Sequence, residues 1–323
     1  MSILEDKINH LDHEAEVKRI ADFMKGYLRD KARRRGLIVA VSGGVDSSVC
    51  AALAVRAVGR KRVLALRLPE MDSSETTGDL SQKLVDHLGL ECITTPITDI
   101  LSAIGCYHWR DEAIRELFPE YGDGWKNKIV IDGGLEGQYN HFKLVVEDPQ
   151  GRQHSKRMEY RQYLQIVAAT NHKQRIRKTL EYFHADRLNY AVLGTPNLLE
   201  YDQGFFVKNG DGSADIKPIA HLYKSQVYGM ARHLGLPEEI CNAVPTTDTY
   251  SLAQGQDEFY FALPYQQMDV ALWAYRHGLP ASELSAELGI SEQRAELVYK
   301  DIEAKRRMTE YLVMNPASLE PVQ

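Results

Sequence analysis

The sequence predicts an α/β fold with a doubly wound parallel sheet. The apolar run at residues 37–41 is mostly β-branched, as expected of a buried strand that is covered on both faces in a parallel sheet, and residues 63–68 form a second, largely apolar run. Segments with apolar residues at helical spacing lie between these runs. This alternation of strand and helix favours a parallel sheet, in which ligands bind at the carboxyl ends of the strands.

The bulk composition limits the classes of function. The chain has 323 residues, 44% of them hydrophobic, which is enough for a large core, and we predict a single domain over residues 1–323. A net charge of −6 provides no general attraction to nucleic acid or to an anionic membrane. Four scattered cysteines without a C-x-x-C pair favour a reducing cytoplasm over a disulfide framework or a zinc site. With no signal peptide or membrane span in the sequence, we expect a cytoplasmic protein without nucleic-acid or membrane partners.

The first hundred residues read as regular elements. Residues 13–31 have an apolar stripe beneath a charged face and predict a helix that covers the sheet. A helix over 46–58 follows the first strand, and a helix over about 76–89 separates the second strand from a third near 92–95. Three parallel strands are therefore expected before residue 100.

Residues 105–157 interrupt this pattern, and we predict that they form an insertion. Two segments, 142–147 and 154–160, face each other across a D-P-x-G turn, as in a β-hairpin. A long helix over 160–183 and a buried strand over 190–193 then resume the alternation.

The remaining chain is predicted to contain a second hairpin and a helical tail. The hairpin spans 205–218 around the Asn-Gly-Asp-Gly turn, and a helix follows over 224–234. The tail occupies about 263–323, and its segment 279–305 has the outline of a helix-turn-helix. Acidic side chains on the second of these helices would repel DNA phosphate. We therefore expect a helical lid or a dimer element.

The most informative stretch joins the first strand to its helix and reads S-G-G-V-D-S-S. Glycines let backbone N–H groups approach an anion, and the helix N-terminus adds free N–H groups and a positive dipole. A phosphate is therefore the expected ligand. The sequence lacks both G-x-x-x-x-G-K-[ST] and G-x-G-x-x-G, which argues against a Walker lysine and a Rossmann dinucleotide site. The ATP-site candidates in this loop are Ser42, Gly43, Gly44, Val45, Asp46, Ser47 and Ser48.

This loop resembles the SGGxDS loop of the ATP pyrophosphatases, which split ATP between its α and β phosphates and transfer AMP to a substrate oxygen. The resemblance implies that the loop holds pyrophosphate and that Asp46 holds Mg²⁺. Glu200 lies six residues beyond Gly194, close enough to the end of the buried strand to reach the same ion, and carboxylates are the ligands that Mg²⁺ prefers. Lys224 opens a helix, where a cation opposes the helix dipole unless an anion lies nearby.

The two stretches together, with residues 244–248 and 257–258, resemble the ammonia-dependent NAD synthetases over about 20–100 and 171–317. The resemblance implies a flavodoxin-like sheet, a cytoplasmic homodimer, and amidation of nicotinic acid adenine dinucleotide with ATP, Mg²⁺ and ammonia. The further ATP-site residues that it implies are Arg67, Thr195, Lys224 and Thr246. The acceptor-site residues that it implies are Asn171, Lys173, Arg177, Lys208, Asp211 and Asp215.

The chain departs from that family at three places. The insertion of residues 105–157 is longer than the family core requires. The segment after Leu68 and Pro69 lacks the usual glutamine near the adenine, and residues 311–313 stand where family members usually carry basic residues. These departures leave the residues of the ATP half unchanged.

We therefore predict an enzyme that amidates a pyridine carboxylate. Transfer of AMP to the carboxylate supplies a leaving group, with pyrophosphate stabilised by the loop and Mg²⁺. Lys224 would neutralise charge at the α-phosphate, and Asp211 is the candidate general base for ammonium. Ammonia would come free or from a separate glutaminase. The alternatives are a different carboxylate or tRNA substrate on the same machinery, and a protein that binds ATP without reacting.

Overall fold

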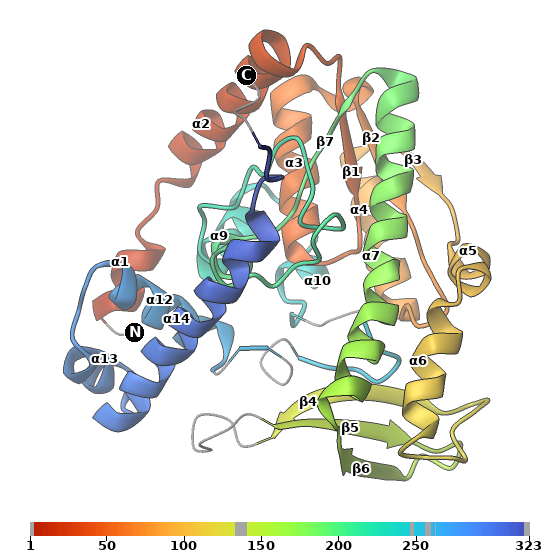
Figure 1. Ribbon diagram of the computed structural model, residues 1–323. Coiled ribbons are helices and arrows are strands. Elements are labelled where there is room, and N and C mark those ends of the chain that lie inside the picture. The colour runs from red at the N-terminus through yellow and green to blue at the C-terminus, as the bar shows by residue number, and fades with distance from the viewer. Residues whose placement is uncertain (1–2, 133–140, 246–248, 256–259, 262, 320–323) are drawn as a thin grey trace.

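The computed structural model describes residues 3–132, 141–245, 249–255, 260–261 and 263–319. Its main feature is a parallel sheet with the strand order β3-β2-β1-β7 (Figure 1). These strands are β1 (Leu37–Ala40), β2 (Val63–Arg67), β3 (Glu91–Thr94) and β7 (Ala191–Val192). Ile38 of β1 pairs with Leu64 on one side and with Val192 on the other. In flavodoxin the first strand lies between the second and the third, so the order here differs from the flavodoxin order.

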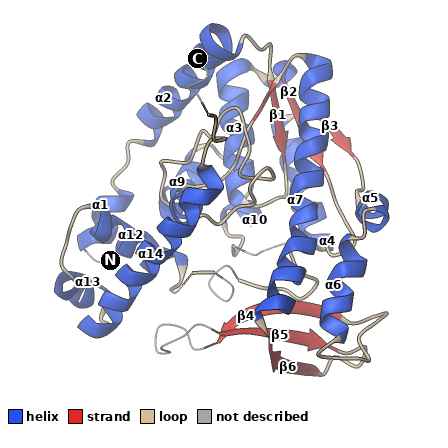
Figure 2. Ribbon diagram, viewed as in Figure 1, coloured by secondary structure: helices blue, strands red, loops and turns tan. Residues whose placement is uncertain are grey.

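Helices cover both faces of this sheet (Figures 1 and 2). Leu37 and Val39 point to one face and Ile38 to the other, because successive side chains of a strand alternate. The first face packs against α2 (His13–Gly26), α3 (Val45–Val58), α4 (Glu75–Leu88), α9 (Lys224–His233) and α10 (Glu238–Cys241). The second face packs against α5 (Thr98–Ala103), α6 (Cys106–Arg115) and α7 (Tyr160–Leu188). The doubly wound parallel sheet predicted from the sequence is therefore confirmed.

Two helices differ in length from their predictions. The helix expected over 13–31 ends as α2 at Gly26 and continues as a π-helical turn over Tyr27–Ala32, after which Arg33 takes a left-handed conformation. Helix α7 extends beyond the expected residue 183 to Leu188, and Asn189 then ends it with a φ of 56°. Both ends coincide with a left-handed residue, a common way to close a helix.

Residues 126–157 contain a small antiparallel sheet beneath the main one (Figure 2). Strands β5 (His141–Glu147) and β6 (Gln153–Arg157) form the predicted hairpin, and the carboxylate of Asp148 accepts hydrogen bonds from two backbone N–H groups of its turn. A strand that was not predicted from the sequence, β4 (Lys126–Asp132), pairs with β5. Ile129 and Leu144 pack against α6 and α7 in a separate apolar cluster.

The second predicted hairpin, over residues 205–218, is wrong. The chain there forms consecutive turns, because the N–H groups of Gly210 and Gly212 both donate to the carbonyl oxygen of Val207. Ile216 forms a parallel bridge with Leu193 beside β7. The segment that was expected to return as an antiparallel arm thus extends the parallel sheet by one short pairing.

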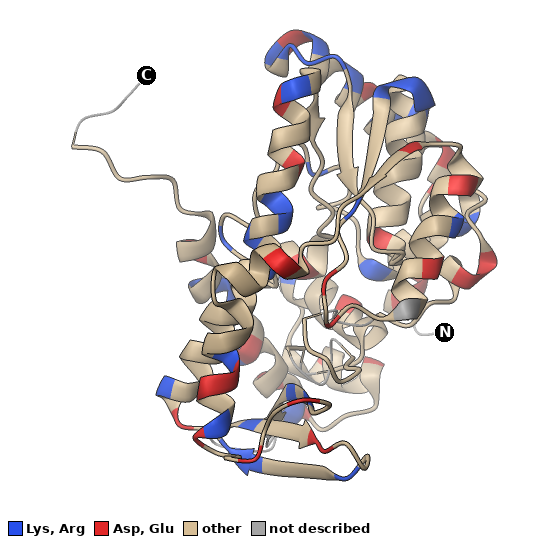
Figure 3. Cartoon of the chain, turned by 90° about the vertical axis from the view of Figure 1, so that its right-hand side faces the viewer, with Lys and Arg blue, Asp and Glu red and all other residues tan. Residues whose placement is uncertain are grey.

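The helical tail packs against the N-terminal residues. A second apolar core joins α1 (Ile3–Asn9), α8 (Leu198–Gln203), α12 (Tyr265–Arg276), α13 (Ala281–Leu288) and α14 (Glu292–Val313). Acidic and basic residues are interspersed along the chain in Figure 3. Within the described ranges, no helix is long and apolar enough to cross a membrane.

Candidate active site

The glycine loop lies at the carboxyl end of β1 and packs closely against α4. Gly43 has a φ of +80°, and a Cβ at this position would lie 2.7 Å from the Cβ of Leu80 and 2.8 Å from the backbone N of Ser81. Both the conformation and the space therefore require glycine. The hydroxyl of Ser48 donates to the carbonyl oxygen of Gly44 at 2.8 Å, which ties the loop to the first turn of α3.

Exposure divides the loop residues into two groups. Ser42 and Gly44 are exposed, whereas Val45, Ser47 and Ser48 are buried. The hydroxyl of Ser47 donates to the carbonyl oxygen of Gly44 at 3.1 Å and accepts a hydrogen bond from the N–H of Ser42 at 3.3 Å. Ser47 therefore joins two backbone groups of the loop, and the N–H of Gly44 donates to the hydroxyl of Ser42 at 3.4 Å, on the exposed side of the loop.

Asp46, in the first turn of α3, forms an ion pair with Lys224 in the first turn of α9. The side chain of Lys224 is 2% exposed. The amide of Asn197 donates to the other oxygen of Asp46 at 3.1 Å. Burial alone would favour the neutral amine, but the carboxylates of Asp46 and Glu200 outweigh it and raise the pKa of Lys224. The amine is therefore a fixed positive charge beside the glycine loop.

Glu200 is oriented by the N-terminus of α8. Its N–H donates to the side chain of Asn197 at 3.1 Å, and its carboxylate accepts from the N–H of Asn197 at 3.2 Å, which is a capping box. Asn197 was not identified from the sequence, although the spacing N-x-x-E of residues 197–200 is the signal of such a cap. Three helices, α3, α8 and α9, thus bring two carboxylates and one amine together.

The donor set fits Mg²⁺. Among the described residues, no group of three or more His, Cys, Asp and Glu side chains forms a metal site. Mg²⁺ usually takes only one or two carboxylates and completes its shell with water and substrate phosphates. Asp46 and Glu200 provide two such carboxylates. Together they already stabilise one positive charge, the amine of Lys224.

Asp269 of α12 supports Lys224 and was not identified from the sequence. Its carboxylate accepts hydrogen bonds from the N–H of Lys224 at 3.2 Å and from the N–H and hydroxyl of Ser225, both at 2.7 Å. It therefore caps α9 and offsets the dipole that opposes Lys224. Burial raises the pKa of Asp269 to about 6, although the hydrogen bonds from Ser225 act in the opposite direction. No local pattern marks this residue.

Arg67 lies at the carboxyl end of β2, but its guanidinium is bound to α4. It donates to the hydroxyl of Ser81 at 2.9 Å, to the side chain of Gln82 at 2.6 Å and to the carbonyl oxygen of Gly78 at 2.8 Å. Thr195 is half-buried just beyond β7. Thr246 lies outside the described residues.

Lys173 of α7 is buried at the centre of an ionic cluster. Its amine donates to Glu70 at 3.0 Å, to Asp72 at 2.6 Å and to the carbonyl oxygen of Thr249 at 2.9 Å. From α6, Arg110 donates to Asp72 at 2.6 Å. The charged side chains of Glu70, Asp72 and Arg110 are all buried. The cluster therefore joins α6, α7 and the loop before α4.

We expect Lys173→Met to lower the free energy of unfolding by about 3–5 kcal/mol, because it leaves buried carboxylates without their shared cation. Chemical denaturation at neutral pH measures this loss. Adding Glu70→Gln should recover part of it by removing one of those charges. Lys61→Met, at an exposed lysine, is the matched control and should change stability by less than about 0.5 kcal/mol. An equally small effect of Lys173→Met would contradict a stabilising role for the cluster.

The predicted acceptor residues lie in two places. Asn171 and Arg177 are half-buried on α7, and Arg177 donates to the carbonyl oxygen of Leu68 at 3.2 Å. In the segment that follows α8, the amine of Lys208 donates to the carbonyl oxygen of Tyr311 at 2.8 Å and lies 4.1 Å from the centre of its ring. This contact attaches the segment to α14.

The two aspartates of that segment accept backbone hydrogen bonds. Asp211 accepts from the N–H of Val207 at 2.7 Å, and Asp215 accepts from the N–H of Val192 at 2.8 Å. Burial raises the pKa of Asp211, although the hydrogen bond from Val207 opposes it. Asp215 also accepts from the hydroxyl of Tyr182 at 3.4 Å. Both carboxylates therefore shape the turns around β7 in this structure.

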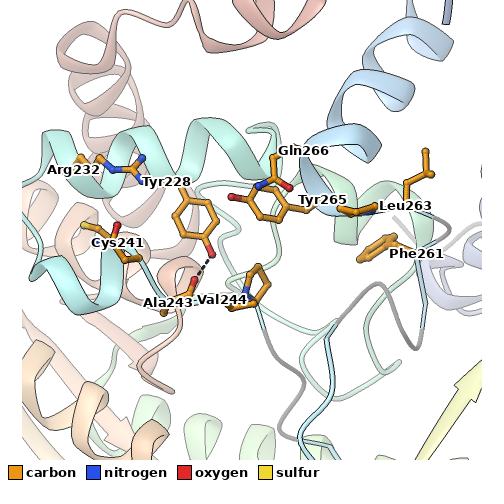
Figure 4. Close-up of a pocket in the computed structure, with 12 residues that line it drawn as sticks. Tyr228, Arg232, Cys241, Ala243, Val244, Phe261, Leu263, Tyr265 and Gln266 are labelled. Atoms are coloured by element: carbon orange, nitrogen blue, oxygen red, sulfur yellow. Dashed lines mark hydrogen bonds between the residues drawn. The ribbon is translucent and has the colours of Figure 1, made fainter. Parts of the chain in front are cut away.

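A pocket of about 390 Å³ lies along α9, beyond Lys224 (Figure 4). Tyr228 and Tyr265 stack at 5.3 Å within it, and the hydroxyl of Tyr228 donates to the carbonyl oxygen of Ala243 at 2.6 Å. The amine of Lys224 lies 5.9 Å from the centre of the Tyr228 ring. The pocket thus adjoins Lys224, but Asp46, Glu200 and Lys224 do not line it.

The family model described as NAD synthase matches residues 16–118 and 141–311. It leaves residues 119–140 between its two matched parts, a segment shorter than the predicted insertion of 105–157.

One curated relative is the NH(3)-dependent NAD(+) synthetase of Rhizobium meliloti (strain 1021), which is 54% identical over 314 residues, covering 97% of this chain and 94% of the relative. Two solved structures resemble this chain at 20% sequence identity. An NMN synthetase from Francisella tularensis has a TM-score of 0.64 and coverage of 95% of this chain and 98% of the other. An NH3-dependent NAD synthetase from Campylobacter jejuni has a TM-score of 0.62 and coverage of 96% and 100%. At this identity the structures support the fold alone.

Proposed function

The chain belongs to the NAD synthase family, and from this premise we propose that it amidates nicotinic acid adenine dinucleotide with ammonia while cleaving ATP to AMP and pyrophosphate. The observation that carries this proposal is the convergence of Asp46, Glu200 and Lys224 beside the glycine loop.

The reaction has two steps. An oxygen of the acceptor carboxylate attacks the α-phosphorus of ATP, the bond between the α-phosphorus and its bridging oxygen breaks, and pyrophosphate leaves. Ammonia then attacks the carbonyl carbon of the mixed anhydride, AMP leaves, and a proton is released as the amide forms. The first step is needed because a free carboxylate offers ammonia no good leaving group.

The residues beside the glycine loop have different roles in this reaction. Ser42 and Gly44 are exposed where the pyrophosphate would bind, and the N-terminus of α3 also favours an anion there. Lys224 provides a fixed charge for the α-phosphate, since charge placed in advance stabilises a transition state most effectively. Asp46 and Glu200 would hold Mg²⁺, which when bound neutralises phosphate charge. The ATP contacts of Arg67, Thr195 and Thr246 remain part of this proposal.

The proposed binding residues for the acceptor are Asn171, Lys173, Arg177, Lys208 and Asp215. Asp211 would accept the proton that ammonium loses. A raised pKa makes a carboxylate a better base, which supports this role for Asp211. Lys173 would act indirectly, since its amine is already bound by Glu70 and Asp72.

The proposed partners are a second copy of the chain and a source of ammonia. A second copy of the chain is supported by large apolar side chains exposed one turn apart on α7, namely Tyr160 at 73% and Leu164 at 46%. Ammonia would be free or supplied by a separate glutaminase. A cytoplasmic location is consistent with the unpaired state of all four cysteines.

We expect AMP and pyrophosphate to form in equal amounts with NAD when the protein receives nicotinic acid adenine dinucleotide, ATP, Mg²⁺ and ammonium. Chromatographic separation of AMP, ADP and NAD measures this. A parallel reaction with nicotinic acid mononucleotide tests the size of the acceptor and should be slower. Formation of stoichiometric ADP would contradict the proposed function. Preferential amidation of the mononucleotide would instead identify it as the acceptor.

A further inference from the structure

Lys217 lies at the same edge of the sheet as the glycine loop. The N–H of Asp215 donates to the carbonyl oxygen of Val192 at 3.0 Å, and Ile216 forms the parallel bridge with Leu193. These contacts make residues 215–217 a neighbour of β7, which in turn neighbours β1. Because neighbouring strands lie about 4.8 Å apart, Lys217 is roughly two strand spacings from the end of β1.

The stem of Lys217 is held in place by close packing. A Cβ on Gly194 would lie 3.1 Å from the Cγ of Lys217 and 3.6 Å from its Cε. The end of β7 therefore approaches the stem closely only because residue 194 is a glycine. The stem of Lys217 thus lies against Gly194, just beyond β7.

The amine of Lys217 lies against two aromatic rings. It is 4.4 Å from the centre of the Tyr201 ring and 5.8 Å from that of Phe206. The two rings stack on each other at 5.8 Å. Tyr201 belongs to α8, the helix that also carries Glu200. The amine and the proposed metal ligand are thus adjacent to the same short helix.

Lys217 differs from the other lysines of the site in its partners. Lys173, Lys208 and Lys224 each donate to a carboxylate or a carbonyl oxygen. Among the described residues, the half-buried amine of Lys217 has aromatic neighbours but makes no hydrogen bond.

The charged groups around Lys217 do not neutralise its amine. Burial and then the charge of Lys178 lower the pKa of Lys217, and Asp211 opposes them. Lys178 is itself paired with Glu181 at 2.7 Å. Asp211 is engaged by the N–H of Val207. A half-buried cation without a bound anion favours a negatively charged ligand, because such a ligand restores the interactions lost on burial.

We propose that Lys217 binds the carboxylate of the acceptor's pyridine ring and holds it for reaction with ATP. This inference rests on the proposed function, which supplies an aromatic carboxylate as substrate. Lys217 would act before the chemical step, by orienting one carboxylate oxygen while the other attacks. The amide product lacks that negative charge, so it would bind this amine less well, which favours its release.

The test compares the acid and the amide as ligands. Calorimetric titration with nicotinic acid adenine dinucleotide and with NAD, in the presence of α,β-methylene ATP, measures affinity without turnover. Lys217→Met should weaken binding of the acid by roughly tenfold to a hundredfold, the effect of losing one charge-assisted hydrogen bond. Its affinity for NAD should change by less than about threefold, since no charge pair is lost. Lys217→Arg should retain part of the affinity for the acid.

Two controls separate the possible failures. Lys61→Met, at an exposed lysine distant in sequence from the site, should leave both affinities unchanged, and Lys217→Gln gives the same comparison if the Met variant does not fold. Equal weakening of acid and amide would overturn the inference in favour of a packing role, and so would unchanged binding of both. Failure of the unaltered protein to form NAD would instead overturn the proposed function.

Discussion

Asp46→Asn is expected to lower kcat by about two to four orders of magnitude, because it removes one charge from a metal-centred transition state. Asparagine keeps the size of the side chain and an oxygen for the amide of Asn197, which donates to Asp46 at 3.1 Å. The loss should therefore reflect charge more than shape. Steady-state kinetics at saturating ATP, acceptor and ammonium measure kcat. Asp22→Asn, at an exposed carboxylate of α2, is the matched control and should leave kcat unchanged.

Glu200→Gln extends this test to the second carboxylate. We expect a similar loss of about two to four orders of magnitude, and only a little more in the double variant, because both side chains would act through one ion. The capping box at Asn197 survives in Glu200→Gln, since glutamine can also accept the backbone hydrogen bond. If the two losses multiplied, the shared-ion interpretation would be wrong.

Lys224→Met should lower kcat by roughly two to three orders of magnitude, because it removes a pre-positioned charge from the α-phosphate. Methionine fills much of the same buried space, and the hydrogen bonds from the backbone of residues 224 and 225 to Asp269 do not depend on the side chain of Lys224. The acceptor should bind with nearly unchanged affinity. A loss of acceptor affinity equal to the loss in kcat would contradict a role at the phosphate.

The same variant has a second readout that is independent of turnover. The amine of Lys224 is paired with Asp46 and lies in the field of Glu200. Removing it should therefore strengthen Mg²⁺ binding in the absence of nucleotide, since no internal cation then competes for the carboxylates. Calorimetric titration with Mg²⁺ measures this, and Asp46→Asn should weaken the same binding. Weaker Mg²⁺ binding in Lys224→Met would argue against two carboxylates shared between amine and metal.

Contiguous patterns were the reliable part of the sequence. An apolar run, a pair of glycines and a helix start occupy neighbouring positions, and they form β1, the glycine loop and α3. The strand and helix alternation likewise predicted the doubly wound sheet, because a strand that is buried on both faces is a continuous apolar run in the sequence. The roles of the loop residues in binding remain a prediction.

Side-chain partners from distant segments were not predictable in this way. Lys173 carries the basic character expected of a ligand contact, yet it is buried against Glu70 and Asp72, about a hundred residues earlier in the chain. Asp269 caps α9 from a helix of the tail, 45 residues beyond Lys224. Nothing near either residue in the sequence indicates these pairings.

The segment around Gly210 shows the same division. Its Asn-Gly-Asp-Gly sequence correctly predicted a turn, because glycine and asparagine tolerate the backbone conformations of turns. Whether the flanking residues pair with each other depended on what else was within reach, and Ile216 pairs with Leu193 of the existing sheet. The sequence by itself determined the strand, loop and helix at the glycine pair and the class of the sheet. Only the tertiary structure decided which carboxylate meets which lysine, because an ion pair depends on distances between chain segments that no local pattern encodes.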